Sequence, residues 1–397
     1  MSSGQDLGLV EPSGDGLEPG PGKLTPPAGR GADVTVLGQF SHRARAVLVA
    51  PSSQQLGESV LAVLVAFALG AVALAANGIN PQSAYAALVS GSLGSAQSLA
   101  STAVQAAPLL VASLAVGISF RAGVFNIGAG GQIGVGALAA AVVGGYTRLG
   151  PGLELVAMAA AALAAGAVWA SVAGVLKAYT GANEVITTLM LTYVATNLID
   201  YAVTGPAKAP GAINQTPQLS GQAMFPTLVG NTQLTAAIIV ALVLVPLVWL
   251  LLFRTGYGFR LRMVGLNPDA ATAAGFSVRR VGVSVLALSG ALAGLGGMLE
   301  VAGVLGSVPQ DMSLQVGYTA IVVALLGNNG PGGILLASTL LGALAAGSTN
   351  MQSAAGVSGP FVVLLEAIMI GTVVGMPVLV RYLRARRRTA PRGAEAR

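Results

Sequence analysis

The chain contains no cysteine, and His42 is its only histidine. Disulfide frameworks and zinc sites built from cysteine or histidine are therefore excluded within the chain. Nucleophilic catalysis that depends on histidine is disfavoured as well, because His42 lies in a Gly- and Pro-rich stretch that predicts no fixed structure. No other cluster of metal ligands is evident, and we expect no metal site.

Charged residues are also scarce, since they make up 9% of the 397 residues, against about a quarter in soluble domains. Hydrophobic residues make up 54%, and the mean hydropathy is +0.76. These values predict an integral membrane protein. The sequence also lacks a GxxxxGK[ST] phosphate-binding loop and a paired intramembrane Asp motif, so neither ATP hydrolysis nor intramembrane proteolysis is expected of the chain itself.

Long apolar segments are the main feature that is present. A helix needs about 20 residues to cross the hydrocarbon layer. We expect an all-α, polytopic membrane helix bundle with about ten transmembrane helices, at residues 56–76, 103–120, 127–145, 153–176, 185–203, 234–253, 281–304, 316–326, 334–347 and 361–380. The segments 316–326 and 334–347 are short, and the GNNGPGG sequence between them fits either a cytoplasmic turn or the tip of a re-entrant pair.

The distribution of basic residues predicts the orientation. With the N-terminus in the cytoplasm, only Arg148 and Lys208 fall outside, and both termini are cytoplasmic, as the positive-inside rule favours. Residues 1–55 are rich in Gly, Pro and Ser and predict a disordered cytoplasmic tail rather than a signal peptide. Residues 381–397 form a basic cytoplasmic tail. The excess of basic over acidic residues thus reflects the membrane topology. We expect no nucleic acid partner.

A basic cytoplasmic loop at 254–280 contains the signals of a short capped helix. Asn267 suits the N-cap, Pro268 the first helical position and Asp269 the positive end of the helix dipole. Ala270 and Ala271 propagate the helix, which Gly275 ends. A helix this short is only marginally stable in isolation. It is therefore either an ordinary capped loop helix or a helix that contacts a partner.

Polar residues within the apolar segments are the other candidates for function. Their roles stay open between lining a solute pathway and bonding to the chain's own backbone. Near one membrane boundary lie Asn126 and Gln132, and a polar stripe follows at 183–200; the candidate pathway residues are Asn126, Gln132, Asn183, Glu184, Thr187, Thr188 and Asn197. A third group, Glu300 with Pro309, Gln310 and Asp311, suggests a solvated loop more than an external vestibule or a docking surface. The GxxxG pair Gly290 and Gly294 is expected to be a packing position.

Three motifs in register carry a resemblance to a known family. They are FNIGAGGQ at 125–132, NEVITTLML at 183–191 and GYGFRLRMVGLNPDAATAAG at 256–275. Together they resemble permease subunits of bacterial ABC importers, in the nucleoside and simple-sugar branch that is related to the branched-chain amino acid permeases. The resemblance covers residues 56–380. The chain departs from the usual pattern at Gly130, where an acidic residue is common, and at Thr192.

The resemblance implies a multi-pass subunit of the bacterial cytoplasmic membrane, surrounded by lipid, that moves a small polar solute. It assigns the coupling to the ATPase to Asn267, Pro268, Asp269, Ala270, Ala271 and Gly275. It also implies a separate ABC ATPase that uses ATP and Mg, with no cofactor on this chain, a second permease subunit that is often a paralogue, and an extracellular substrate-binding lipoprotein. Nucleosides are the first expected solutes and simple sugars the second. The alternative is an autonomous secondary transporter or channel for a small polar solute.

Overall fold

Apolar segments form α-helices through most of the chain that the structure describes. The computed structural model describes residues 53–150, 152–230, 232–310, 312, 315–365, 367–368, 371–372 and 375. The helices are α2 (Ser53–Ala76), α3 (Pro81–Leu93), α4 (Ala96–Arg121), α5 (Ala129–Tyr146), α6 (Leu153–Thr180), α7 (Glu184–Thr204), α8 (Ala237–Arg254), α9 (Gly256–Leu266), α10 (Pro268–Ala273), α11 (Val278–Glu300), the π-helical turn η1 (Val301–Leu305), α12 (Gln315–Leu326) and α13 (Pro331–Ala355). Within the described ranges the only β structure is two isolated bridges, so the all-α prediction is confirmed there.

Seven of the described helices are long and apolar enough to cross a membrane. They are α4, α5, α6, α7, α8, α11 continued by η1, and α13. Residues 64–76 of α2 and the whole of α12 are apolar but shorter. Half of the predicted segment 361–380 lies outside the described residues. The predicted tails at 1–55 and 381–397 also lie outside them, apart from the first residues of α2.

The structure differs from the predicted segments at two places. Residues 81–93 form α3, which starts with Pro81 after the N-cap Asn80 and was not expected because the segment is short and polar. The predicted segment 334–347 is part of the 25-residue helix α13. Hydroxyl groups near its end bond to the preceding turn, as Ser348 does to the Ala345 carbonyl at 2.8 Å, so polar residues continue the helix beyond the apolar stretch.

Glycines bring the central helices of the unit Gln55–Arg397 into backbone contact. A Cβ built on Gly290 of α11 would lie 2.2 Å from the Gly166 carbonyl oxygen of α6, and a Cβ on Gly294 would lie 2.3 Å from the Ala162 oxygen. On α5, a Cβ at Gly136 would lie 2.3 Å from the Gly294 Cα. The GxxxG pair on α11 is therefore a packing position, as predicted, and it packs within the chain.

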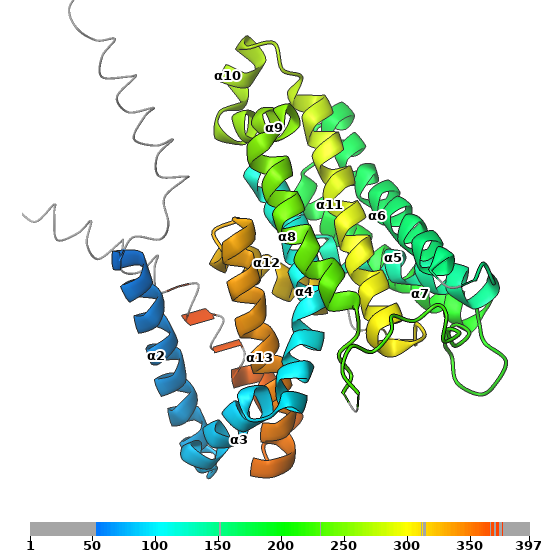
Figure 1. Ribbon diagram of the computed structural model, residues 1–397. Helices are drawn as coiled ribbons and strands as arrows, with labels where there is room; N and C mark the ends of the chain where they lie inside the picture. Colours follow the sequence, from blue (N-terminus) through cyan, green and yellow to red (C-terminus); the bar gives the residue numbers. More distant parts are fainter. Residues whose placement is uncertain are drawn as a thin grey trace, which may run out of the picture. The chain divides into compact units, whose positions relative to one another are not determined.

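The two ends of this unit carry different elements. Helices α9 and α10 lie at one end and α3 at the other (Figure 1). The turn between α12 and α13 is at the end that carries α9, because Arg121 at the end of α4 donates to the Asn329 carbonyl and the same α4 terminus packs against α9. Asn328 and Asn329 in this turn adopt φ values of 51° and 52°, a left-handed conformation that Asn tolerates better than most residues.

Candidate coupling surface and candidate solute cavity

Helix α10 is closed at both ends by its own sequence. The Asn267 side-chain oxygen accepts hydrogen bonds from the Asp269 and Ala270 amides, each at 3.0 Å. At the other end Gly275 has φ +83°, and the amides of Gly275 and Phe276 donate to the Thr272 and Ala271 carbonyls at 2.9 and 3.0 Å. This pair of bonds is a Schellman motif. The predicted cap residues are confirmed as caps.

Most of α10 is exposed. Ala271 is buried, whereas Pro268, Asp269, Ala270, Thr272 and Ala273 are exposed. One side chain thus anchors the helix to the unit, and the other faces are free to meet a partner within the described part of the chain. The loop-helix alternative explains the caps but gives no reason for so much exposed surface in so short an element.

Helix α9, which sequence reasoning did not identify, holds α10 in place. A Cβ on Gly258 would lie 2.1 Å from the Leu251 oxygen, and one on Gly265 would lie 2.1 Å from the Arg121 oxygen, so α9 is packed closely against α8 and α4. The Tyr257 hydroxyl lies 3.0 Å from that of Ser284 on α11. Burial raises the pKa of Tyr257, although this hydrogen bond lowers it in part. The Thr255 N-cap, which accepts from the Gly258 amide, was the available sequence signal for α9.

Arg121 joins three elements at this end of the unit. Its guanidinium donates to the carbonyls of Asn328 and Asn329, and it also lies 5.2 Å from the ring centroid of Phe253 on α8. Arg262 of α9 lies 5.1 Å from the same ring. Both distances are within the range of cation–π attraction. Sequence reasoning used Arg121 only as a topology signal, whereas the structure makes it a link between α4, α8 and the turn after α12.

Asn126 and Gln132 form a closed polar network. The Asn126 amide nitrogen donates to the Gln132 carbonyl oxygen and to the Ser289 hydroxyl, both at 2.9 Å, and Gln132 donates back to Asn126 at 3.0 Å. Ser289 in turn donates to the Ala115 carbonyl at 2.7 Å. The side chains of Asn126, Gln132 and Ser289 are buried. The network ties the start of α5 to α4 and α11, and a pathway role for Asn126 and Gln132 stays a prediction.

The polar residues of α7 bond mainly to their own helix. The Asn183 side chain caps it by accepting from the Val185 amide at 2.9 Å, and Glu184 pairs with Lys177 of α6 at 2.6 Å. Hydrogen bonds to backbone carbonyls one turn earlier are made by Thr187, Thr188 and Asn197. Thr188 also accepts from the Ile127 amide at 3.2 Å, which attaches the FNIGAGGQ segment to α7. Their pathway role also stays a prediction.

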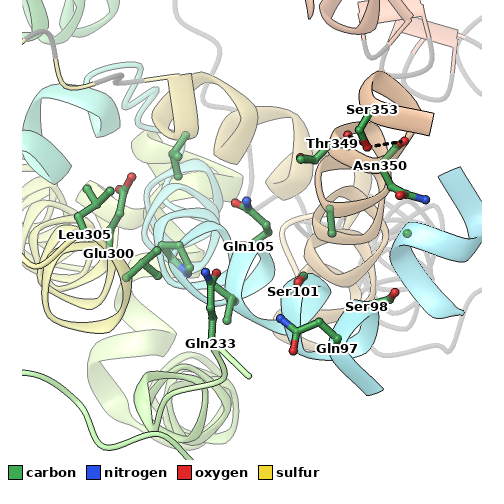
Figure 2. Close-up of a pocket in the computed structure, with 16 residues that line it drawn as sticks. Gln97, Ser98, Ser101, Gln105, Gln233, Glu300, Leu305, Thr349, Asn350 and Ser353 are labelled. Atoms are coloured by element: carbon green, nitrogen blue, oxygen red, sulfur yellow. Dashed lines mark hydrogen bonds between the residues drawn. The ribbon is translucent and has the colours of Figure 1, made fainter. Parts of the chain in front are cut away.

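A cavity of about 500 Å³, lined by both polar and apolar side chains, opens at the end of the unit opposite α10. Side chains from α4, α11 and α13 surround it (Figure 2). The lining residues are Gly91, Gln97, Ser98, Ser101, Val104, Gln105, Pro108, Gln233, Glu300, Val304, Leu305, Val316, Ala346, Thr349, Asn350 and Ser353. Glu300 is the last residue of α11, so the solvated-loop interpretation was wrong for this residue. Most of the other polar lining residues were missed because they are uncharged and lie at helix ends.

Several side chains in this cavity have no hydrogen-bond partner within the part of the chain that the structure describes. They are the carboxamides of Gln97, Gln105 and Gln233 and the carboxylate of Glu300, one oxygen of which is buried. Asn350, in contrast, donates to the Ala87 carbonyl at 2.7 Å. Glu300 is the only ionisable residue among the lining residues that the structure describes. Among the described lining residues, the cavity therefore offers hydrogen-bond donors and acceptors and a single carboxyl group.

The family of the chain follows from a comparison with known proteins. Residues 98–376 match the family described as "Branched-chain amino acid transport system / permease component". The chain belongs to this permease family. It is 36% identical over 337 residues to a glucose ABC transporter permease protein of Haloferax volcanii, covering 82% of this chain and 89% of the relative. It is 34% identical to a guanosine ABC transporter permease protein of Bacillus subtilis, covering 78% and 90%.

A third relative is a nucleoside ABC transporter permease protein of Lactococcus lactis, 33% identical over 74% of this chain and 84% of the relative. A second permease from each of the same three organisms is also similar to this chain, with lower identity. The identities are 32% for Haloferax volcanii, 29% for Bacillus subtilis and 27% for Lactococcus lactis. No solved structure matches the permease. The resemblance drawn from the three motifs is confirmed.

Membership places the permease in the cytoplasmic membrane as a multi-pass, non-catalytic subunit of an ABC importer. Such an importer works with an ATPase and a substrate-binding protein. The departure at Gly130 lies where α5 and α12 touch, since a Cβ on Gly317 would be 2.2 Å from the Gly130 nitrogen. Thr192 packs against α5 as well, because a Cβ on Gly131 would be 2.8 Å from its Cα.

Proposed function

We propose that this permease imports nucleosides, or else simple sugars, with energy from ATP that a separate ABC ATPase hydrolyses with Mg. The permease itself holds no cofactor in this proposal. The relatives named for guanosine, nucleosides and glucose support this solute class. The uncharged hydrogen-bonding groups of the cavity fit such solutes, because their hydroxyl and amide groups both donate and accept.

The exposed helix α10 is the observation on which the coupling role rests. We assign ATPase coupling to Asn267, Pro268, Asp269, Ala270, Ala271 and Gly275, with the caps fixing the helix and the exposed face meeting the ATPase. Its attachment through α9 to α4 and α8 provides a route by which movement of the ATPase reaches the spanning helices. This role requires the α10 end to be cytoplasmic.

The assembly would contain ten spanning helices in this chain, with both termini in the cytoplasm. This number is the sum of the seven long helices and three further segments, which are α2, α12 and residues 361–380. A second permease subunit, related but not identical, would complete the pathway, as the paired permeases of the three organisms suggest. An extracellular lipoprotein would deliver the solute to the face opposite α10. The polar residues of α5 and α7 would then border the pathway or position the helices that do.

The coupling role is tested by changing Ala270 to Glu. Ala270 is exposed, so the helix should keep its place while the added bulk and charge disturb the ATPase contact. Ala271 is unsuitable because it is buried. Ala212→Glu, at an exposed position in the loop at the opposite end, is the matched control.

Vesicles that contain the complete importer should show ATP-dependent uptake of guanosine, uridine or glucose. Ala270→Glu should abolish most of that uptake at unchanged permease levels, and Ala212→Glu should not. Normal uptake by Ala270→Glu would refute the coupling assignment. Uptake by the permease alone, driven by an ion gradient, would instead establish the secondary transporter, and absence of uptake for all three solutes would refute the solute class.

A further inference from the structure

The cavity lies where two spanning helices depart from regular α-helical bonding. Pro108 in α4 has no amide hydrogen, so the Val104 carbonyl one turn earlier receives no helical bond from it. On the facing side, α11 passes into the π-helical turn η1 directly after Glu300. Val104, Pro108 and Glu300 all line the cavity. Interrupted helices and π-turns are frequent at binding sites in membrane proteins and elsewhere, because they direct unpaired polar groups toward a ligand.

Helix α12 makes the site deeper than a surface groove. Its 12 residues span only about 18 Å, which is shorter than a hydrocarbon layer of about 30 Å. Its first turn contacts the start of α5, since a Cβ on Gly317 would lie 2.2 Å from the Gly130 nitrogen. The neighbouring Val316 lines the cavity. The cavity thus reaches from its open end to the place where α5 and α12 begin inside the bundle.

The Glu300 carboxylate has no compensating charge here. No Lys or Arg is among the lining residues, and one carboxylate oxygen is buried without a hydrogen-bond partner in the described part of the chain. A buried and unpaired carboxylate is costly to maintain. That cost is offset when a ligand donates hydroxyl or N–H hydrogen bonds to it. An anionic ligand would instead place its own charge beside a carboxyl group, with no Lys or Arg among the described lining residues to compensate it.

We propose that this cavity binds an uncharged polyhydroxylated solute, with the Glu300 carboxylate accepting hydrogen bonds from it and the Gln97 and Gln233 carboxamides completing the contacts. The proposal rests on the import function proposed above and adds the site within this chain and the rule by which it selects. Uncharged solutes are retained because they donate to Glu300, and anionic analogues are rejected by the same group.

The absence of cysteine from the chain gives a direct test, because one introduced cysteine is the only thiol of the permease. Gln105→Cys places it in the cavity, Ser113→Cys on a buried part of the same helix, and Ala212→Cys in an exposed loop. In the complete complex in nanodiscs, a charged methanethiosulfonate reagent should label Gln105→Cys and Ala212→Cys but not Ser113→Cys. Solute at about ten times its Kd should then slow labelling of Gln105→Cys about tenfold and leave Ala212→Cys unchanged.

The solutes in this test are guanosine, uridine, glucose and glucuronate, the last of which differs from glucose by a carboxylate. At least one of the three neutral solutes should protect Gln105→Cys, and glucuronate should not. Protection of Gln105→Cys by none of the neutral solutes, or equally by glucose and glucuronate, would overturn the proposal. Transport by the same complex is measured in parallel, so that an importer that moves these solutes without protection at Gln105→Cys refutes the cavity alone.

Glu300→Gln in the Gln105→Cys background tests the carboxylate. Loss of a charged hydrogen bond should raise the concentration needed for protection about tenfold to a hundredfold. The labelling rate without solute should stay the same when it is measured with a neutral methanethiosulfonate reagent, whose reaction does not depend on the lost charge, and this shows that the cavity is intact. Glu154→Gln is the matched control, because Glu154 is buried with an unpartnered oxygen but lies outside the cavity. Equal protection curves for Glu300→Gln and Glu154→Gln would remove Glu300 from the site.

Discussion

Replacement of Gly290 by alanine tests the close contact between α6 and α11. The added Cβ would lie 2.2 Å from the Gly166 oxygen and 2.3 Å from the Ala170 Cβ, where ordinary contacts begin near 3.4 Å. The helices must therefore separate by roughly 1 Å or distort, because close-packed interiors have no free space to absorb the methyl group. Overpacking of this kind costs about 1–3 kcal/mol, and both clashes are with atoms on the α6 backbone or next to it, so we expect about 3 kcal/mol.

The assay is thermal unfolding of the purified permease complex, followed by the loss of the monodisperse species in size-exclusion chromatography. Gly290→Ala should lower the midpoint by several degrees. Gly282→Ala on the same helix is the control, because a Cβ there meets nothing within 4 Å and alanine favours the helix by about 1 kcal/mol. Adding Ala170→Gly to Gly290→Ala should recover part of the loss, since it removes one of the two clashing partners. The same midpoint for Gly290→Ala and Gly282→Ala would refute backbone contact at this crossing.

Two further predictions concern polar contacts. Arg121→Ala removes the donors to Asn329 and the contact over Phe253, and should destabilise the complex by about 2–3 kcal/mol in the same unfolding assay, while Arg121→Lys should recover only part of this because it cannot reproduce the guanidinium geometry. Asn126→Leu should cost about 2–4 kcal/mol because it leaves several buried partners unpaired, whereas Asn197→Leu, at an exposed position with one bond to its own helix, should be nearly neutral. Similar midpoints for the two Asn variants would contradict a structural role for the Asn126 network.

Local signals in the sequence were sufficient for α10. The Asn267 cap, Pro268 and Gly275 act within a few residues of one another, so their bonds could be inferred without tertiary structure. The apolar stretches likewise gave the all-α fold, because length and hydropathy decide what a bilayer accepts. Helix α9 was missed because Arg260 and Arg262 interrupt its apolar pattern, and it is held by backbone contacts at Gly258 and Gly265 that have no local signature.

The cavity could not be predicted for a related reason. Its polar groups come from helices that are far apart in the sequence, such as Gln105 on α4, Glu300 on α11 and Thr349 on α13. Each is unremarkable in its own segment, and only tertiary packing brings them together. Asn126 and Gln132 were correctly chosen as unusual polar residues, but sequence alone cannot tell a satisfied network from an open site, because the partner Ser289 is on another helix.

Helix α11 has one end directly after α10 and the other at Glu300, with its crossing on α6 near the middle at Gly290. From that crossing the helix extends about 18 Å toward Val278 and about 15 Å toward Glu300. Close contacts with α6 extend along much of this length, from Gly174 against Val283 to Gly166 against Gly290 and Ala162 against Gly294. The two helices therefore form one closely packed pair. A displacement at the α10 end would reach the Glu300 carboxylate through movement of α6 and α11 together, so the cavity would change its width as this pair shifts against α4 and α13.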